Sequence, residues 1–597
     1  MAGLDMRSTA FLGVERSVTG RRWAARASDD RLPFAMAQRL GLPEIVARVL
    51  AGRGIDPDMA AQFLDPKLRE QLPDPSHLRD MDRAAERIAQ AVMDDELIAI
   101  FGDYDVDGAT SSALLYRFLT QAGARVRTYI PDRMREGYGP NAPALLRLKG
   151  EGASVVVTVD CGTTAHDPIE IAAQAGLDVL IIDHHAAEPT LPRAFAVVNP
   201  NRLDEQSPHR QLAAVGVSFL LAVAINRELR RRNWYARRAE PDLMALLDLV
   251  ALGTVCDVVP LTGLNRALVA QGLRVVAQRR NAGLMALAEV ARVNERCGTY
   301  HLGFMLGPRV NAGGRIGAAD LGTRLLVTDD PHEARALAQQ LDQLNRDRQA
   351  IEAMVLEEAS AQAALSESDP IVLVGGDGWH PGVIGIVAGR LREHYDRPVC
   401  VIAFDGDIGK ASGRSANGID LGAAIIAARQ AGLLINGGGH AQAAGFTVAR
   451  DQLPALRAFL VERVEAQIAT GLPARALALD GALSVGAATP DLVALLDRVG
   501  PFGAGNPEPR FAFQGVRVAK ADIVGGKHVR CFLTDQRGGR LSGIAFRAAD
   551  TKLGQVLMRG GGSSLHIAGA LRADEWRGEL RIQLQIEDAA EVFSAAA

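Results

Sequence analysis

Five apolar stretches in the first half of the chain have the length and continuity of buried strands. They are residues 97–101, 126–130, 154–159, 178–182 and 195–198. Segments with helical spacing lie between several of them. Continuous apolar strands that alternate with helices are typical of a mostly parallel sheet with both faces covered. The pattern therefore predicts a Rossmann-like α/β domain over residues 76–265, with its ligand site at the carboxyl ends of the strands.

The pattern changes after this domain and predicts three further regions. Residues 266–365 form a helical connector, in which residues 331–364 have the spacing of a single long helix. Residues 366–468 mix strand and helix patterns again, which indicates a second α/β domain. Residues 469–597 contain five short strand patterns separated by glycine turns. Such a series is typical of a small β-barrel such as an OB-fold.

Composition adds limits on compartment and partners. Residues 1–75 are rich in arginine and alanine, and we expect an accessory cap there. The net charge is −4, so a nucleic-acid site must be a local basic patch. The five cysteines form no Cys-x-x-Cys pair, which argues for a reducing compartment and against a zinc–thiolate site. Neither a signal-peptide pattern nor a membrane-length apolar stretch is present, so we expect a cytoplasmic protein.

An acidic turn follows the first predicted strand. Asp103, Asp105 and Asp107 stand at alternate positions, Gly108 comes next, and a helical pattern begins directly afterwards. Like charges this close repel one another unless a cation binds them. The spacing also matches the start of an EF-hand calcium loop, but Leu114 occupies the position where that loop needs glutamate. A solvated acidic turn is the simpler alternative for this stretch when it is taken alone.

Further metal-binding side chains follow later apolar segments. Asp160 ends the third predicted strand, Asp183, His184 and His185 end the fourth, and Asp257 follows a long apolar segment. Each has an ordinary structural reading alone, but several carboxylates and imidazoles at one edge of a sheet indicate a metal centre. Mixed Asp and His ligands suit Mn²⁺ or Mg²⁺ better than Zn²⁺ or Fe²⁺. One or two such ions would steady the attacking and leaving oxygens of a phosphoryl transfer.

The order of these motifs resembles the DHH phosphoesterase superfamily, which includes manganese pyrophosphatases, oligoribonucleases, cyclic-dinucleotide phosphodiesterases and RecJ exonucleases. Phe101 stands where the pyrophosphatase branch has a ligand histidine, which argues against that branch. The resemblance implies that Asp103 and His185 lie beside the metal ligands, with His185 touching the scissile phosphate, and that Asp183 orients a neighbouring histidine. The metal ligands that it implies are Asp105, Asp107, Asp160, His184 and Asp257.

Basic and glycine-rich segments elsewhere are candidates for substrate binding. Arg133, in a loop with two arginines and two tyrosines, would hold a backbone phosphate. Residues 300–317 are interpreted as a glycine-rich loop that approaches an anion, and they resemble the R-x-N-A-x-G-R motif of the RecJ branch. Resemblance to the DHHA1 domain assigns Ser412 and Arg414 to the 5′-terminal phosphate. The other candidates are Arg309, Asn311, Arg315, His380, and Gly438, Gly439 and His440 in a predicted glycine turn.

The resemblance to the RecJ branch covers nearly all of the chain after residue 75. It implies an exonuclease that degrades single-stranded DNA from the 5′ end to mononucleotides, in DNA repair and recombination, with a helicase and a single-strand-binding protein as candidate partners. An oligoribonuclease or cyclic-dinucleotide phosphodiesterase is the alternative within the superfamily. A DNA-binding accessory protein with an inactive metal site is the alternative outside the enzymes. The predicted OB-fold favours the RecJ branch, because the shorter oligoribonucleases lack it.

Overall fold

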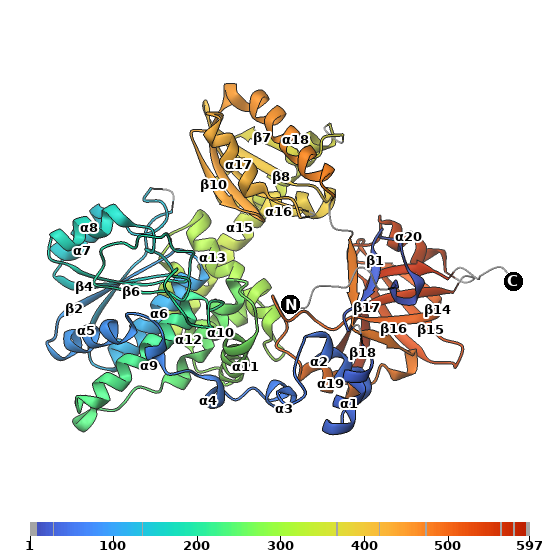
Figure 1. Ribbon diagram of the computed structural model, residues 1–597, viewed down its shortest axis with the longest axis horizontal. Coiled ribbons are helices and arrows are strands. Elements are labelled where there is room, and N and C mark those ends of the chain that lie inside the picture. Colours follow the sequence, from blue (N-terminus) through green and yellow to red (C-terminus); the bar gives the residue numbers. More distant parts are fainter. Residues whose placement is uncertain are drawn as a thin grey trace.

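Figure 1 shows three folded bodies with a long helix between the first two. The helix α15 (Pro331–Ala364) has the predicted bounds and leads from the blue and green domain to the orange one. A red β-barrel follows, and blue N-terminal helices lie beside it. The computed structural model describes residues 9–592, except for residues 28, 134, 366–367, 417, 472–474, 561–563 and 577–578. Within this described part, no helix combines the length and apolar character needed to cross a membrane.

The first domain is built on a sheet of five parallel strands in the order β3-β2-β4-β5-β6. All five predicted strands are present, each within one residue of its predicted ends. In β2, Ile98 and Ile100 face one layer of helices, while Ala99 and Phe101 face the other. The strands are β2 (Leu97–Gly102), β3 (Arg125–Tyr129), β4 (Ala153–Val159), β5 (Asp178–Ile182) and β6 (Ala196–Val198).

Helices cover both faces of this sheet. α7 (Ala142–Gly150) and α8 (His166–Gln174) pack on the face that carries Phe101. The opposite face is covered by α5 (Met81–Met93), α6 (Val106–Gln121) and α9 (Ala214–Arg231). Further helices extend this layer: α10 (Leu247–Cys256), α11 (Gly263–Val276), α12 (Ala282–Val290) and α14 (Leu321–Val327).

The apolar segment before Asp257 is the helix α10, not a strand of the sheet. It is apolar on all sides because it is packed against α6, α9 and α11 in the core. Asp257 is the C-terminal cap of this helix, and the helix carries it to the sheet edge where the other acidic residues lie. The position was predicted, but the element that supplies it was not.

The glycine-rich stretch 300–317 is helical, which corrects the predicted loop. A π-helix (His301–Leu306) continues into α13 (Gly307–Ile316). Its glycines permit close packing: a Cβ on Gly307 would lie 2.4 Å from Cys256 Sγ, and one on Gly314 would lie 2.6 Å from the carbonyl oxygen of Tyr104. The backbone N–H groups serve the helix, while the small residues bring α13 against the acidic turn.

The second domain has a five-stranded mixed sheet in the order β10-β11-β9-β8-β7. Ser412 and Arg414 lie inside β9, and Gly438, Gly439 and His440 lie in the edge strand β10, which corrects the predicted glycine turn. Glycine allows β10 to pack closely, since a Cβ on Gly439 would lie 2.4 Å from the carbonyl oxygen of Ala443. The elements are β7 (Val372–Asp377), β8 (Val399–Asp405), β9 (Ile408–Arg414), β10 (Asn436–His440), β11 (Ala443–Ala449), α16 (Pro381–Tyr395), α17 (Leu421–Gln430) and α18 (Leu453–Ala469).

The C-terminal domain is a β-barrel, as predicted. Pairing of β14 with β17 closes the sheet, and the buried side chains of Phe511 and Phe513 fill its interior. The elements are β13 (Gly481–Leu483), β14 (Phe511–Val524), β15 (His528–Thr534), β16 (Arg540–Ala545), β17 (Leu565–Trp576), β18 (Glu579–Glu591), α19 (Pro490–Asp497) and α20 (Lys552–Arg559).

The N-terminal segment packs onto this barrel. Strand β1 (Arg22–Ala25) pairs in parallel with β12 (Ala476–Leu479). Trp23 is fully buried, and its Nε1 donates a hydrogen bond to Asp588 Oδ2 at 3.0 Å. Apolar residues of the N-terminal helices share one core with the barrel strands. These helices are α1 (Arg31–Leu40), α2 (Glu44–Gly52) and α3 (Ala60–Leu64). The next helix, α4 (Leu68–Gln71), packs against α11 instead, and its Leu68 belongs to the core of the first domain.

Candidate metal centre and active site

The acidic turn places its carboxylates between a strand end and two helix N-termini. Asp105 caps α6, and its Oδ1 accepts a hydrogen bond from the backbone N–H of Gly108 at 3.0 Å. Asp107 lies in the first turn of α6. Its two oxygens accept backbone N–H groups at the start of α9, from Ala214 at 2.7 Å and Val215 at 2.9 Å. Helix N-termini favour negative charge, so these contacts hold both carboxylates in place.

The next two strands deliver Asp160 and His184 to the same place. Asp160 directly follows β4 with a φ of 63°, a left-handed conformation that is uncommon outside glycine, and its side chain is buried. His184 follows β5. Its Nε2 lies 3.3 Å from Asp160 Oδ1, 3.6 Å from Asp257 Oδ2 and 3.9 Å from Asp107 Oδ2. One imidazole nitrogen therefore faces three carboxylates from three different elements.

The atoms that converge here make no hydrogen bonds with the described residues. They are Asp103 Oδ1, Asp160 Oδ1, Asp257 Oδ2 and His184 Nε2, and all four are buried. A buried polar atom without a partner costs free energy, and native proteins rarely tolerate several together. A bound cation would satisfy all of them, so the residues present fit a metal centre.

The donor atoms form three overlapping groups, and two of these share no residue and are each suited to one cation. Within each group, the candidate ligand atoms lie within 4.8 Å of one another. One group is Asp107, His184 and Asp257, and the other is Asp103, Asp105 and Asp160. Asp160 also forms a group with His184 and His185, so it lies between the two positions. Mainly oxygen donors with one imidazole suit Mn²⁺ or Mg²⁺.

The carboxyl groups raise one another's pKa. Burial, and next the charge of Asp105, raises the pKa of Asp103 to about 8. The same two causes raise the pKa of Asp257 to about 7. Burial and neighbouring carboxylates also raise the pKa of Asp107 and of Asp160 well above the ordinary range. A divalent cation would offset both the burial and the repulsion, which is a second reason to expect one here.

Asp183 orients the two histidines. Its Oδ1 accepts the backbone N–H of His184 at 2.7 Å, that of His185 at 3.1 Å, and the His185 ring Nδ1 at 2.8 Å. Burial opposes ionisation of Asp183, but the hydrogen bonds from His185 hold its pKa below the ordinary range. Burial, and next the charge of His185, lowers the pKa of His184 to about 4, so its ring is neutral, as a metal ligand must be.

Two asparagines that the sequence analysis did not single out bind the backbone of the two histidines. Asn199 Nδ2 donates to the carbonyl oxygen of His185 at 2.9 Å, and Asn201 Nδ2 donates to that of His184 at 2.5 Å. Both lie just after β6, the strand beside β5. The signal in the sequence was the Asn-Pro-Asn run at the end of the fifth predicted strand, where a polar side chain reaches the same edge as the metal ligands.

Family models match the three bodies of the structure in order. The "DHH family, N-terminal domain" matches residues 97–254, the "DHHA1 domain" residues 368–466, and the "RecJ OB domain" residues 479–588. The chain is 38% identical to the single-stranded-DNA-specific exonuclease RecJ of Dickeya dadantii, over 92% of this chain and 96% of that protein. The chain belongs to the RecJ family of single-stranded-DNA-specific exonucleases.

Solved RecJ structures agree with the fold. Crystal structures of Thermus thermophilus RecJ in complex with Mn²⁺ and with Mg²⁺ match this chain with TM-scores of 0.77 and 0.73 and sequence identities of 31% and 30%. The match covers 95% of this chain in both cases, and 79% and 78% of the Thermus chains. The order of domains described above is therefore that of a RecJ-family protein.

Three of the residues predicted to bind substrate meet beside the acidic turn of this RecJ-family chain. The Arg133 guanidinium lies over the ring of Tyr104, 4.9 Å from its centre. Arg315 Nη1 donates to the carbonyl oxygen of Gly382 at 2.9 Å, which joins α13 to α16 of the second domain. Burial, and next the charge of Arg133, lowers the pKa of Arg315 to about 10 and also lowers the pKa of His380. Cationic groups thus gather where the two domains meet.

Ser412 and Arg414 lie side by side on β9. Arg414 Nη1 donates to Ser412 Oγ at 3.3 Å and to the carbonyl oxygen of Gly413 at 2.9 Å. No carboxylate among the described residues pairs with Arg414, so its charge is available to a ligand. Gly385 of α16 faces the pair, and a Cβ there would lie 3.0 Å from Ser412 Oγ. The absence of a side chain at that position leaves room for a group that approaches both residues.

The other predicted substrate residues belong neither to the cluster at the domain junction nor to the pair on β9. Arg309 forms an ion pair with Asp342 at 2.9 Å and donates to the carbonyl oxygen of Met305, so it fastens α13 to α15. Asn311 is half-buried in α13, and Gly438, Gly439 and His440 line the edge of the second sheet. Roles for these residues in substrate binding stay predictions.

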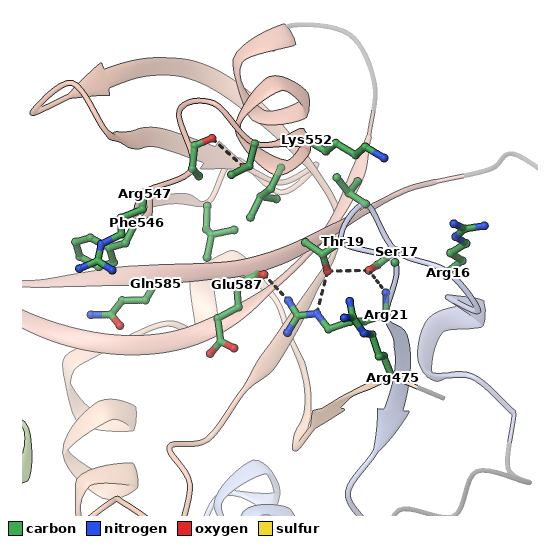
Figure 2. A pocket seen from close by; sticks show the side chains of 16 residues that line it. Arg16, Ser17, Thr19, Arg21, Arg475, Phe546, Arg547, Lys552, Gln585 and Glu587 are labelled. Carbon is green, nitrogen blue, oxygen red and sulfur yellow. Dashed lines mark hydrogen bonds between the residues drawn. The ribbon is translucent and has the colours of Figure 1, made fainter. Parts of the chain in front are cut away.

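The RecJ-type barrel exposes two aromatic rings, and one of them, Phe546, lines a basic cavity. Phe532 and Phe546 are 41% and 54% exposed, whereas Phe511 and Phe513 are core residues. A cavity of about 1020 Å³ lies between the N-terminal segment and the barrel. Its lining includes the charged side chains of Arg16, Arg21, Arg475, Arg547, Lys552 and Glu587, which are labelled in Figure 2. Because this cavity is formed partly by residues 16–21, the N-terminal segment contributes to a positively charged surface of the barrel.

Proposed function

We propose that this protein is a metal-dependent exonuclease that degrades single-stranded DNA from the 5′ end and releases mononucleotides. The main support is the cluster of buried carboxylate and imidazole atoms that make no hydrogen bond with the described residues, in a RecJ-family fold. Concentrated carboxylates repel phosphate, so a protein that only bound DNA would have no use for them. Once the carboxylates bind divalent cations, the site attracts phosphate instead of repelling it.

We assign the metal ligands as Asp105, Asp107, Asp160, His184 and Asp257, with Asp103 beside them and Mn²⁺ or Mg²⁺ as the ions. Thermus RecJ structures in complex with either ion support both choices. When bound, such ions bring water and phosphate together, lower the pKa of the water and offset charge on the phosphate oxygens. The donor geometry of the chain has room for one or two of them.

The surrounding residues orient the substrate rather than form a covalent bond with it. Asp183 fixes the His185 ring through Nδ1, and this leaves the other ring nitrogen to donate to a phosphate oxygen. Arg133 and Arg315 add positive charge where the two domains meet, on the side of Tyr104. Cys161 and Cys256 lie beside the carboxylates, but burial raises the pKa of both thiols, so neither is an activated nucleophile. We find no other candidate nucleophile among the described residues of the site and propose direct attack of water on phosphorus.

We propose that Ser412 and Arg414 bind the terminal 5′-phosphate and so select the 5′ end. An unpaired guanidinium beside a hydroxyl is suited to a phosphate monoester, which carries more charge than an internal phosphodiester. The pair sits on the second domain, across the junction from the metal ligands. A strand held there by its end would be cleaved close to that end, as an exonuclease requires.

Replacing Arg414 by alanine is expected to lower kcat/KM on a 5′-phosphorylated strand by about 10- to 100-fold, since a charge-assisted hydrogen bond contributes about 1.5–3 kcal/mol. On a 5′-hydroxyl strand the change should be small. Initial rates on the two oligonucleotides measure the difference. Arg429→Ala, an exposed site at the end of α17, is the control and should change neither rate. An equal loss on both strands would rule out a role in recognising the phosphate.

The barrel and its basic cavity are proposed to hold the strand beyond the cleaved end. Exposed Phe532 and Phe546 would supply faces on which bases stack, and Arg547 and Lys552, which line the cavity with Phe546, would contact the backbone phosphates. Stacking requires unpaired bases, which favours single strands over duplex. An enzyme limited to single strands needs a supply of them, so we propose cooperation with a helicase and a single-strand-binding protein in cytoplasmic DNA repair and recombination.

A further inference from the structure

A cavity of about 610 Å³ lies where three parts of the chain meet, apart from the metal centre. The N-terminal helices supply Phe63 and Met59, the start of α11 supplies Leu264 and Arg266, and the loop before the barrel strands supplies Asn506. The same loop is tied to the first domain, because the backbone N–H of Leu261 donates to the carbonyl oxygen of Ala504 at 2.7 Å. A ligand that fills this cavity would touch all three parts.

Arg266 carries a buried positive charge at the wall of this cavity. The residue is 2% exposed, and no carboxylate among the described residues pairs with it. Its Nη2 donates to the carbonyl oxygens of Arg498, Val499 and Gly500, and its guanidinium lies over the ring of Phe63, 3.7 Å from the centre. Its Nε is buried and makes no hydrogen bond with the described residues. Carbonyl dipoles and an aromatic face lessen the cost of this charge but do not balance it.

Arg53, the other arginine of the cavity, is compensated. Its Nη1 pairs with Asp480 Oδ1 at 3.1 Å, its Nε donates to Asn506 Oδ1 at 2.8 Å, and its Nη2 donates to the carbonyl oxygen of Pro507 at 2.6 Å. The difference matters, because Arg266 is then the buried cation of the cavity that has no hydrogen-bonded carboxylate. The exposed carboxylate of Asp56 also lines the cavity, so a bound phosphate would have to lie on the Arg266 side, away from Asp56. Burial, and next the charge of Arg53, lowers the pKa of Arg266 to about 10, so Arg266 remains charged at neutral pH.

We propose that this cavity binds a phosphate monoester, with the phosphate on the Arg266 side and a nucleoside against the apolar wall. Ile55, Met59, Phe63 and Leu264 offer that wall, and Gln62, Gln71 and His209 offer polar atoms at the rim. The volume is ample for one mononucleotide. The ligand is inorganic phosphate or a nucleoside 5′-monophosphate, the latter being the product that the proposed nuclease releases.

Binding in this cavity would make the position of the barrel depend on the concentration of the released mononucleotide. Arg266 already holds the loop at residues 498–500, and Phe63 fixes the N-terminal helices against it. A ligand between them would strengthen that joint, and strand-holding by the barrel would change with it. The site needs neither metal nor an intact active site, so its test is independent of the proposed exonuclease activity.

The test is equilibrium binding of radiolabelled dAMP and of inorganic phosphate to the full-length Arg414→Ala protein in EDTA, so that neither the metal centre nor the proposed 5′-phosphate site holds the ligand. Each further variant is made in this background. We expect saturable binding to one site. Met59→Trp fills the cavity from a side chain that is 52% exposed, so the fold should persist while binding weakens at least about tenfold. Arg266→Gln should also lose binding. Met354→Trp, at a 63% exposed position on α15 outside the cavity, is the matched control and should bind normally.

Comparing dAMP with inorganic phosphate shows whether the natural ligand is a nucleotide or free phosphate. Tighter binding of dAMP than of phosphate assigns the apolar wall to a nucleoside, and equal binding assigns the site to phosphate alone; both support a phosphate site beside Arg266. No saturable binding of either ligand at millimolar concentration would overturn the proposal. So would binding that Met59→Trp leaves unchanged, because the ligand would then lie elsewhere.

Discussion

Replacing Asp160 by asparagine is expected to reduce cleavage of single-stranded DNA at least about 1,000-fold while strand binding survives. Asparagine keeps the shape and tolerates the left-handed backbone at this position, whose φ is 63°. Only the charge is removed, and Asp160 is the residue that lies between the two groups of ligand atoms. Initial rates with Mn²⁺ on a labelled oligonucleotide, together with a gel-shift assay in EDTA, measure both effects.

The same variant should be more stable than the wild type in EDTA and gain less stability from Mn²⁺. Removing one of several buried, mutually repelling carboxylates stabilises the apo protein, and it also removes a ligand that the metal would bind. Thermal unfolding of both proteins in EDTA and in Mn²⁺ measures the difference in stability under each condition. Asp95→Asn is the matched control, since Asp95 is also left-handed, with a φ of 55°, but its side chain is 75% exposed at the far end of β2. Full activity in Asp160→Asn would refute the proposed metal centre.

Replacing Gly108 by alanine is expected to lower kcat at least about 100-fold and to destabilise the protein by about 1–3 kcal/mol. A Cβ at this position would lie 2.4 Å from the carbonyl oxygen of Asp103 and 2.6 Å from its backbone nitrogen. The backbone of the acidic turn would have to move, and Asp105 caps α6 through the N–H of Gly108 itself. Steady-state kinetics and urea unfolding measure the two losses.

Gly389→Ala is the matched control for this substitution. Gly389 also lies inside a helix, α16, but a Cβ there has no neighbouring atom within 4 Å. Alanine should therefore stabilise the helix by about 0.5–1 kcal/mol and leave cleavage unchanged. If Gly108→Ala behaved like Gly389→Ala, the close packing of the acidic turn would have no bearing on catalysis.

The first domain was predictable because its signals are local. Apolar runs such as residues 154–159 and 178–182 have the length of buried strands, and a candidate metal ligand follows each run: Asp160 after the first and His184 after the second. In a parallel sheet the carboxyl ends of neighbouring strands meet at one edge, so residues far apart in the chain were expected to converge. The long helix α15 was equally visible, since its helical spacing continues without interruption to Ala364.

The features that the sequence did not reveal depend on tertiary contacts. Glycines at 307, 313 and 314 indicated a loop, but close packing against Cys256, Ala318 and Tyr104 makes glycine the residue that a helix needs there. A segment that is apolar on all sides gave no indication of whether Asp257 follows a strand or a helix. Arg266 is an ordinary helical arginine in the sequence, and only the fold brings residues 498–500 to it. Local periodicity cannot report such pairings.

The most direct test of the proposed function uses one oligonucleotide labelled at either end, as a single strand and as a blunt duplex, with Mn²⁺, Mg²⁺ or EDTA. The account predicts that mononucleotides are released from the 5′ end of the single strand with either metal, that EDTA stops the reaction, and that the duplex is spared. Release from the 3′ end would contradict the placement of the 5′-phosphate on Ser412 and Arg414. Cleavage that persists in EDTA would contradict the metal centre itself.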